Sequence, residues 1–236
     1  KTSDLKKALR IQSFKHENIG FKNFDDKPTT KVIVDTPADV SKLKRRLLEE
    51  GIDCYEADIR FSYRFLIDED IKGSLEIKGK HEKGELIDLV YEEPELKPTY
   101  CHPELKIASI DIETNQQHNL IYSISIYAKE FKKAFIISDK KLKNAIRCKD
   151  EAELLKKFKN KILQLDPDVI SGWNVIDFDF KVIKERMKHH HIPFIIGRTS
   201  WPCKLRLSNS FFISSKVDIP GRVVLDGIEL MKNAHI

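Results

Sequence analysis

Several features that define other protein classes are scarce or missing in this sequence of 236 residues. No run of about 18 apolar residues occurs, so nothing in the sequence is expected to span a membrane. The N-terminus lacks the charged, apolar and small-residue pattern of a secretory signal. Only four cysteines are present and none forms a CxxC pair, which argues against a zinc site. We expect reduced, buried thiols in a cytosolic protein.

The composition that remains is that of a globular protein with a mildly basic charge. Apolar residues make up 41% of the chain, enough for a real core. The net charge of +5 and the pI of about 8.8 are compatible with a polyanionic partner, although most of the mixed charges should form a solvated surface. The sequence begins at Lys1 rather than Met, so we expect a piece of a longer protein.

The first hundred residues predict a small α+β domain, which we place at residues 1–103. The expected elements are a strand at 31–35, a helix at 36–51, a strand at 54–59 and a strand pair formed by 74–79 and 85–92. Three prolines at positions 94, 98 and 103 then interrupt regular structure, so a linker is expected at 92–105.

Residues 104–236 predict a second domain in which strands and helices alternate. The expected strands are 107–113, 120–128, 132–138 and 168–174, the expected helices are 150–167 and 179–191, and 221–232 should be a strand running into a helix. This order predicts an α/β layer fold built on a mixed sheet, so that the chain as a whole is α+β.

Paired carboxylates are the first sign of chemistry in the second domain. Asp111 and Glu113 are two residues apart on an expected strand, so they share a face and repel each other. Mg²⁺ or Mn²⁺, which prefer oxygen ligands, would remove this repulsion; the alternative is that one carboxylate faces solvent at a strand end. Asp179 follows a second strand and could simply start a helix. Acids from two strand ends in a basic chain suit a two-metal phosphodiester hydrolase.

Two sequence motifs add a family resemblance to this pattern. DIET at 111–114 and GWNVIDFD at 172–179 resemble the first two exonuclease motifs of the family B DNA polymerases. YEADIRFSYRFLIDEDI at 55–71 and GRVVLDGIELMK at 221–232 resemble segments of the bacterial DNA polymerase II type within that family. The resemblance covers roughly residues 30–236, which is nearly the whole chain.

The resemblance implies a ribonuclease H-like 3′–5′ exonuclease domain at residues 104–236 and a role for six side chains. Asp111, Glu113 and Asp179 fall on the catalytic acids that bind two divalent ions, Mg²⁺ or Mn²⁺. The positions that hold the frayed 3′ end of DNA in this family are occupied here by Thr114, Asn174 and Phe178. Taken without the motif, these three residues would be a strand-end cap, a turn residue and a core residue.

The family's third motif, a Tyr followed four residues later by an Asp, should come after the last recognised segment, and the chain stops at Ile236 before it. We therefore expect a fragment without polymerase activity and with weak or no exonuclease activity. For the parent protein the resemblance implies DNA synthesis in replication or repair, in the bacterial cytoplasm. Its partners would be a single-stranded primer 3′ end, primer–template duplex and a sliding clamp bound through the absent part.

Two other functions are compatible with the sequence. One is a stand-alone DNA exonuclease, and the other is a non-catalytic DNA-binding module with a degenerate nuclease fold. The presence of all three acids argues against the second. Among the remaining polar residues, we expect a hydrogen-bonding role for Asp226, turn-forming roles for Asp166 and Asp168, and a polar helix end at the histidines 189–191.

Overall fold

The computed structural model describes residues 14–85, 87–140, 142–208 and 214–234, and the chain divides into two compact units. One unit comprises Lys1–Lys78 and Pro94–Cys101, and the other comprises Gly79–Glu93 and His102–Ile236. The predicted division into domains at residues 103 and 104 stays a prediction, since these units alternate along the sequence. Within the described ranges, no helix is both long and apolar enough to cross a membrane.

The first unit is built around a β-hairpin and one amphipathic helix. Strands β1 (Phe14–Lys22) and β2 (Pro28–Val34) pair antiparallel, and helix α2 (Pro37–Glu49) follows directly. Leu43 and Leu47, one helical turn apart, are the buried residues of α2, and they pack against the side chains of β2. The predicted first strand and first helix are therefore confirmed.

The strand predicted at 54–59 is wrong. Glu56 has a left-handed φ of 58°, which interrupts an extended run, and helix α3 (Phe61–Asp68) begins shortly afterwards. Arg64 in α3 forms ion pairs with both Glu56 and Asp68. These contacts hold the segment as a turn against the helix instead of as a strand.

The predicted strand pairing and linker after α3 are also wrong. The four short strands of this region are β3 (Leu75–Lys78), β4 (His81–Glu82), β5 (Val90–Tyr91) and β6 (Glu95–Pro98). β3 pairs antiparallel with β6, which lies in the expected linker, and β4 pairs with β5. Pro98 is tolerated opposite Leu75 because both strands of a two-stranded sheet are edge strands, where a missing N–H need not break a ladder.

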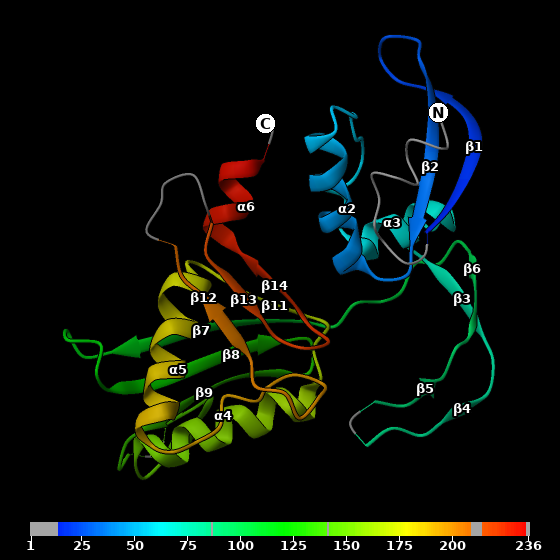
Figure 1. Cartoon of the computed structure of the whole chain (residues 1–236). Coiled ribbons are helices and arrows are strands. Elements are labelled where there is room, and N and C mark those ends of the chain that lie inside the picture. The colour runs from blue at the N-terminus through cyan, green and yellow to red at the C-terminus, as the bar shows by residue number, and fades with distance from the viewer. Residues whose placement is uncertain (1–13, 86, 141, 209–213, 235–236) are drawn as a thin grey trace. The chain divides into compact units, whose positions relative to one another are not determined.

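The second unit contains a six-stranded sheet, and Figure 1 labels β7, β8, β9, β11 and β14 of it. Its strands are β7 (Ile107–Thr114), β8 (Ile121–Ala128), β9 (Phe131–Ile137), β10 (Ala145–Cys148), β11 (Val169–Gly172) and β14 (Val223–Asp226). The order across the sheet is β10-β9-β8-β7-β11-β14, and β8 runs antiparallel to all the others. The predicted mixed sheet is confirmed, with β10 as a strand that the sequence did not indicate.

One face of this sheet carries the core. Burial alternates strictly along β7 from Ile107 to Glu113, with Ile110 and Ile112 facing inward, as the period of a strand requires. Helices α4 (Glu151–Leu165) and α5 (Phe180–His189) cover that face (Figure 1). Beside the strand pair β4–β5, the other described elements of the unit are η1 (Val175–Asp179), β12 (Lys204–Arg206), β13 (Lys216–Asp218) and α6 (Gly227–Asn233).

Glu151, at the start of α4, joins three elements around the core. Its buried carboxylate accepts hydrogen bonds from the Ile121 amide at 2.8 Å, from Arg186 and from the His190 ring at 2.6 Å. Burial acts to raise the pKa of Glu151, but the hydrogen bonds from Arg186, Ile121 and His190 outweigh it and hold that pKa below its usual value. The polar end of α5 thus anchors the helix to α4 and β8.

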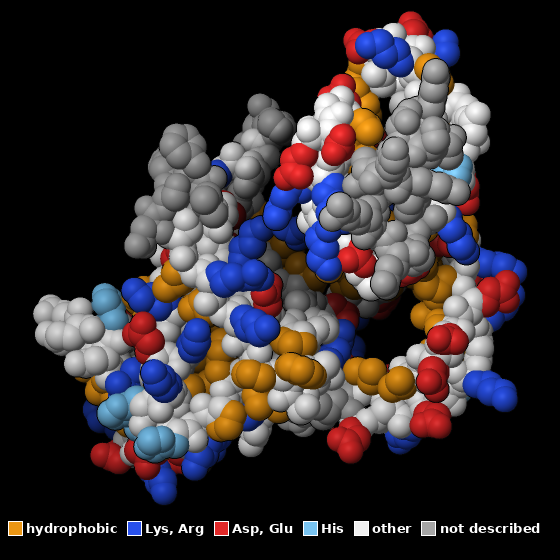
Figure 2. Space-filling model, viewed as in Figure 1, with side chains coloured by type: hydrophobic (Ala, Val, Ile, Leu, Met, Phe, Trp, Pro, Cys, Tyr) orange, Lys and Arg blue, Asp and Glu red, His pale blue; other side chains and the backbone are white. Residues whose placement is uncertain are grey.

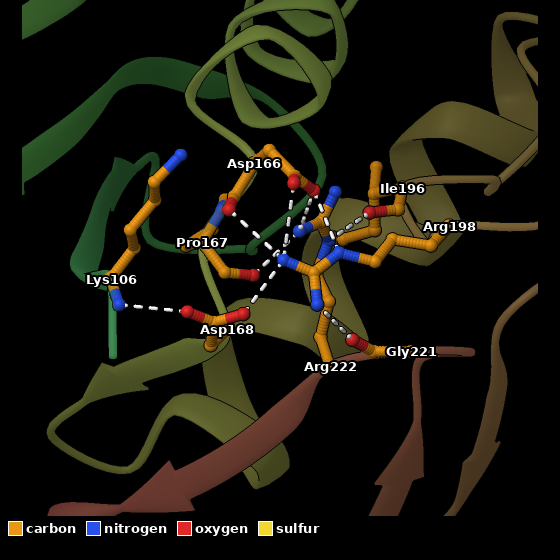
Figure 3. A network of polar contacts seen from close by, with 8 residues as sticks. All are labelled: Lys106, Asp166, Pro167, Asp168, Ile196, Arg198, Gly221 and Arg222. Carbon is orange, nitrogen blue, oxygen red and sulfur yellow. Dashed lines mark hydrogen bonds and ion pairs between the residues drawn. The ribbon is translucent and has the colours of Figure 1, made fainter. Parts of the chain in front are cut away.

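A second polar network lies where β7, β11 and β14 begin (Figure 3). Asp168 accepts from the backbone amide of Lys106, and Arg198 donates to both Asp166 and Asp168. Arg222, buried just before β14, donates to the same Asp166 at 2.8 Å. Asp166 and Asp168 flank a proline turn as predicted, and their carboxylates also fasten three strand starts together.

Replacing Arg222 with alanine should destabilise the second unit by about 2–4 kcal/mol. The guanidinium also donates to the carbonyl oxygens of Pro167 and Ile196, and both would lose a buried donor. The exposed Arg147 of β10 is a matched control, and R147A should change stability by no more than about 0.5 kcal/mol. Urea unfolding monitored by circular dichroism measures both, and equal midpoints for the two variants would contradict the structural role of Arg222.

Candidate active site

The candidate site begins where strands β7 and β11 part. The last paired residues are Ser109 and Ser171, and the next residue of β11 is Gly172. A Cβ atom at Gly172 would lie 2.6 Å from the Ile110 carbonyl oxygen and 3.0 Å from the Val175 Cβ, distances that a side chain cannot occupy. Only glycine lets the chain leave the sheet this closely to β7.

Beyond Gly172 the chain turns into a π-helix. Asn174 has a left-handed φ of 56°, a conformation that asparagine tolerates better than most residues, and η1 follows it. Phe178 donates its backbone N–H to the Asn174 carbonyl at 3.0 Å. The helix predicted to begin at Asp179 therefore begins earlier, with a π-helical turn that places Phe178 and Asp179, and continues as α5.

Asp111 and Glu113 lie together on the face of β7 that points away from the core. Both are exposed, while Ile112 between them is buried, so the predicted shared face is what the structure has. Across the ladder, Asp111 stands opposite Ser125 and Glu113 opposite Ser123 on β8. The acids thus project from a part of β7 that β11 no longer pairs with.

Asp179 is the most strongly perturbed acid at the site. It is 2% exposed, and its Oδ1 atom is buried without a hydrogen-bond partner among the described residues. Burial, followed by the nearby charges of Asp111 and Asp226, raises the pKa of Asp179 to about 7, although the Ile112 amide acts to lower it. A buried carboxylate in this condition calls for a proton or a cation.

Asp226, at the end of β14, supports the site as a structural acid. One carboxylate oxygen accepts from the Ile176 amide of η1 at 3.0 Å, and the other accepts from the Ile228 amide of α6 at 2.9 Å. The hydrogen-bonding role expected for Asp226 is therefore observed. Its charge also acts on Asp179, so a residue with a structural role still shapes the electrostatics of the site.

The candidate ligand atoms at the site are carboxylate oxygens, the type of atom that binds divalent cations such as Mg²⁺. Within the described ranges, no three side chains of His, Cys, Asp or Glu converge closely enough to form a metal site by themselves. The structure does place Asp111 beside Asp179, whose Oδ1 is buried and unpartnered, with Glu113 on the same face as Asp111. Carboxylate oxygens with surplus negative charge are the ligands that Mg²⁺ and Mn²⁺ prefer. The assignment of these three acids as metal ligands stays a prediction.

Two of the predicted substrate-binding residues meet through a histidine that sequence patterns did not single out. His118, in the turn after β7, has its Nδ1 atom 3.0 Å from the Thr114 hydroxyl. The same imidazole meets the half-buried Phe178 ring edge-on, with centroids 5.0 Å apart. Asn115 holds the turn by accepting hydrogen bonds from two backbone amides. The sequence does show a histidine shortly after the D-x-E strand, but residue spacing alone does not predict which side chains it contacts.

Replacing Asp179 with asparagine should stabilise the chain in the absence of divalent ions. A carboxyl whose pKa is raised on folding stabilises the folded state fully below its unfolded pKa, and that stabilisation is lost as the pH rises through the folded value. Between the ordinary value of 3.8 and about 7, the wild type therefore loses stability that the uncharged amide of D179N would keep. The difference above pH 7 is on the order of 4 kcal/mol, since one pH unit is worth about 1.36 kcal/mol.

Thermal unfolding in EDTA at acid and at alkaline pH measures this difference. The exposed neighbour Asp177 supplies the control, because D177N removes a charge from the same turn without touching the buried Asp179 carboxylate. Added Mg²⁺ or Mn²⁺ should stabilise the wild type more than D179N. A D179N variant with the same pH dependence as the wild type would show that Asp179 carries no unfavourable charge.

Comparison with known proteins identifies the family. Residues 52–235 match the model of the family B DNA polymerase exonuclease domain. The chain is 28% identical to DNA polymerase II of Escherichia coli over 94% of its own length, and 31% identical to a DNA polymerase of Archaeoglobus fulgidus over 80%. It spans only 29% and 23% of the lengths of those two relatives.

A solved structure agrees with this at the level of the fold. The family B DNA polymerase of Pyrobaculum calidifontis matches 98% of the chain with a TM-score of 0.67, at 20% sequence identity and over 30% of its own length. The domain match covers both strand ends of the candidate site and the π-helix between them. The chain therefore belongs to the family B DNA polymerases and contains their exonuclease domain.

Proposed function

We propose that the chain is the N-terminal and proofreading 3′–5′ exonuclease part of a family B DNA polymerase of the polymerase II type. The observation that carries the proposal is the burial of Asp179 beside Asp111 where β7 and β11 part. The similarity to the Escherichia coli polymerase II extends over 94% of the chain, against 80% for the archaeal relative, which supports the subgroup.

The reaction is hydrolysis of the last phosphodiester of a DNA strand. A water oxygen bonds to phosphorus, the 3′ oxygen of the preceding nucleotide leaves, and a nucleoside monophosphate is released. Asp111, Glu113 and Asp179 would hold two divalent ions, Mg²⁺ or Mn²⁺. Such ions supply charge stabilisation at the phosphorus and lower the pKa of a bound water. The buried position of Asp179 keeps water from solvating its carboxylate, which preserves its affinity for a cation.

The residues that receive the 3′ end lie beside these acids. The half-buried Phe178 ring offers a face for a terminal base, and the His118 contact fixes its orientation. Thr114 and Asn174 carry polar groups for the sugar or phosphate of the same nucleotide. A mispaired end frays more readily than a paired one, so it reaches these residues more often as a single strand.

The other functions of a DNA polymerase are assigned to a longer protein, because this chain spans only 29% and 23% of the lengths of the two relatives. Template-directed DNA synthesis, in replication or repair, would come from sequence outside this chain. Primer–template duplex and a sliding clamp are the partners proposed for that protein, and the bacterial cytoplasm is its proposed location. Within this chain, the function proposed is removal of the 3′-terminal nucleotide.

The proposal is tested by ion binding and by shortening of DNA. Calorimetric titration of Mn²⁺ into the chain should give heat that is lost in D111A. In keeping with the weak activity expected of this chain, a 5′-labelled single strand should become shorter from its 3′ end only slowly when Mn²⁺ is present, and the rate should fall more than about 100-fold in D111A or D179A. Electrophoresis of the labelled strand measures that rate.

The exposed Asp177 again provides the matched control, since D177N should keep both the heat and the rate. Ion binding that is unchanged in D111A, together with no shortening of DNA, would overturn the proposal in favour of a binding module without catalysis. Shortening from the 5′ end would overturn the assigned polarity.

A further inference from the structure

A row of lysines follows the side of α5 that faces away from the core. Phe180, Ile183 and Met187 form the buried side of the helix, and Lys181, Lys184 and Lys188 follow each other at spacings of three and four residues on another side. Residues at these spacings are neighbours on a helix surface. The three ammonium groups therefore form one strip of positive charge.

This strip borders a groove. Lys181, Lys184, Glu185 and Lys188 line one side, and Leu205 and Leu207, in and just after β12, line the other, around a volume of about 220 Å³. Leu207 is 46% exposed, so its apolar side chain is accessible to a ligand in the groove. Figure 2 shows Lys and Arg side chains gathered over the region of α5. The groove thus combines positive charge with an apolar wall.

The charge of the strip is not neutralised within the described residues. Some lysines elsewhere on helices pair with nearby acids, as Lys157 does with Glu153 and Lys232 with Glu229, both at 3.0 Å. Across the described ranges, no acid lies within ion-pair distance of Lys181, Lys184 or Lys188. Glu185 is the acid in the groove lining and balances one of its three positive charges. An external anion is the natural complement of this surface.

The position of the strip relates it to the candidate site. Asp179 is the N-cap residue of α5, so Lys181 follows it by two residues and Lys188 by nine. With a rise of about 1.5 Å per residue, the strip extends about 10 Å along the helix from Lys181. Each strand of duplex DNA carries a phosphate about every 3.4 Å of helix axis, and a single strand is more extended, so a strip of this length reaches at most about three successive phosphates.

We propose that this α5 groove binds single-stranded DNA, with the three lysines contacting its phosphates and the two leucines contacting its unpaired bases. Single-stranded DNA is favoured over duplex because an apolar wall can only contact bases that are not covered by a partner strand. The inference rests on the proposed function in taking DNA as the polyanion. It adds a second contact surface beside the acids that act on the 3′ end.

The test is the salt dependence of DNA binding by the chain in EDTA, where no hydrolysis occurs. Fluorescence anisotropy of a labelled single strand is measured over a series of NaCl concentrations for the wild type and K184A/K188A. Each phosphate contact on a single strand contributes about 0.7 to the slope of log K against log salt. The double variant should therefore bind more weakly at low salt, with a slope reduced by about 1.4.

A matched control removes the same charge elsewhere. Lys129 and Lys133, exposed at the turn into β9 and on β9, form no ion pair among the described residues, and K129A/K133A should bind with nearly the wild-type slope. Circular dichroism checks that both double variants are folded. K188A alone removes an exposed side chain and should reduce the slope by about 0.7, which keeps the test open if K184A/K188A unfolds.

Each remaining outcome decides the inference. Equal slopes for K184A/K188A and K129A/K133A, or a loss seen with duplex only, would overturn it. The slope lost through K184A/K188A should be the same in the wild type and in the D111A background, because the groove acts separately from the acids. If the proposed nuclease function fails, the chain neither binds ions nor shortens DNA, but the lysine variants still reduce the salt slope. If the groove proposal fails, the chain still shortens DNA, but the lysine variants leave the salt slope unchanged.

Discussion

The candidate site depends on a close approach of two backbones at Gly172. There the chain leaves β11 so near to β7 that any side chain would collide with the Ile110 carbonyl. The separation that follows exposes the outward face of β7 where Asp111 and Glu113 stand, and it leads the chain through a left-handed Asn174 into η1. The turn at which β11 separates from β7 therefore also leads into η1, which carries Phe178 and Asp179 of the candidate site.

Charge is distributed very differently at the two ends of this sheet. Where β7, β11 and β14 begin, Asp166 and Asp168 are matched by Arg198 and Arg222, and hydrogen bonds from Arg198 and Arg222 hold the pKa of Asp166 below its usual range. Toward the other end, Asp111, Glu113 and Asp179 have no ion-pair partner in the part of the chain that the structure describes, and Asp179 has a raised pKa. The paired charges at the first end stabilise the fold. The unpaired acids at the other end destabilise it until a bound cation offsets their repulsion.

The sequence predicts long, periodic elements better than short ones. Strands β7, β8 and β9 and helix α4 are long and periodic, and their predicted bounds lie close to the observed ones. The strands of residues 75–98 are two to four residues long, and their pairing depends on contacts between segments that no local pattern specifies. The four-residue β10 escapes prediction because it is equally short. By contrast, the placement of Asp111 and Glu113 on one face follows directly from their spacing.

The site shows the same division between what is local and what is not. Motif spacing located the acids and the two residues that approach His118, but the π-helical turn and the His118 contacts depend on how the β7 turn meets η1. The raised pKa of Asp179 depends on burial and then on the charges of Asp111, 68 positions earlier in the chain, and Asp226, 47 positions later. These properties arise from tertiary packing, which sequence periodicity does not encode.

The two hydrogen bonds of Asp226 have a mechanical consequence. The Asp226 carboxylate accepts hydrogen bonds from the first turns of both η1 and α6, so it links the two helices directly. A force that displaces α6 must either break the bond to Ile176 or carry η1 with it, and Asp179 lies at the far end of that short helix. The position of α6 is therefore coupled, through Asp226 and η1, to the most deeply buried acid at the site.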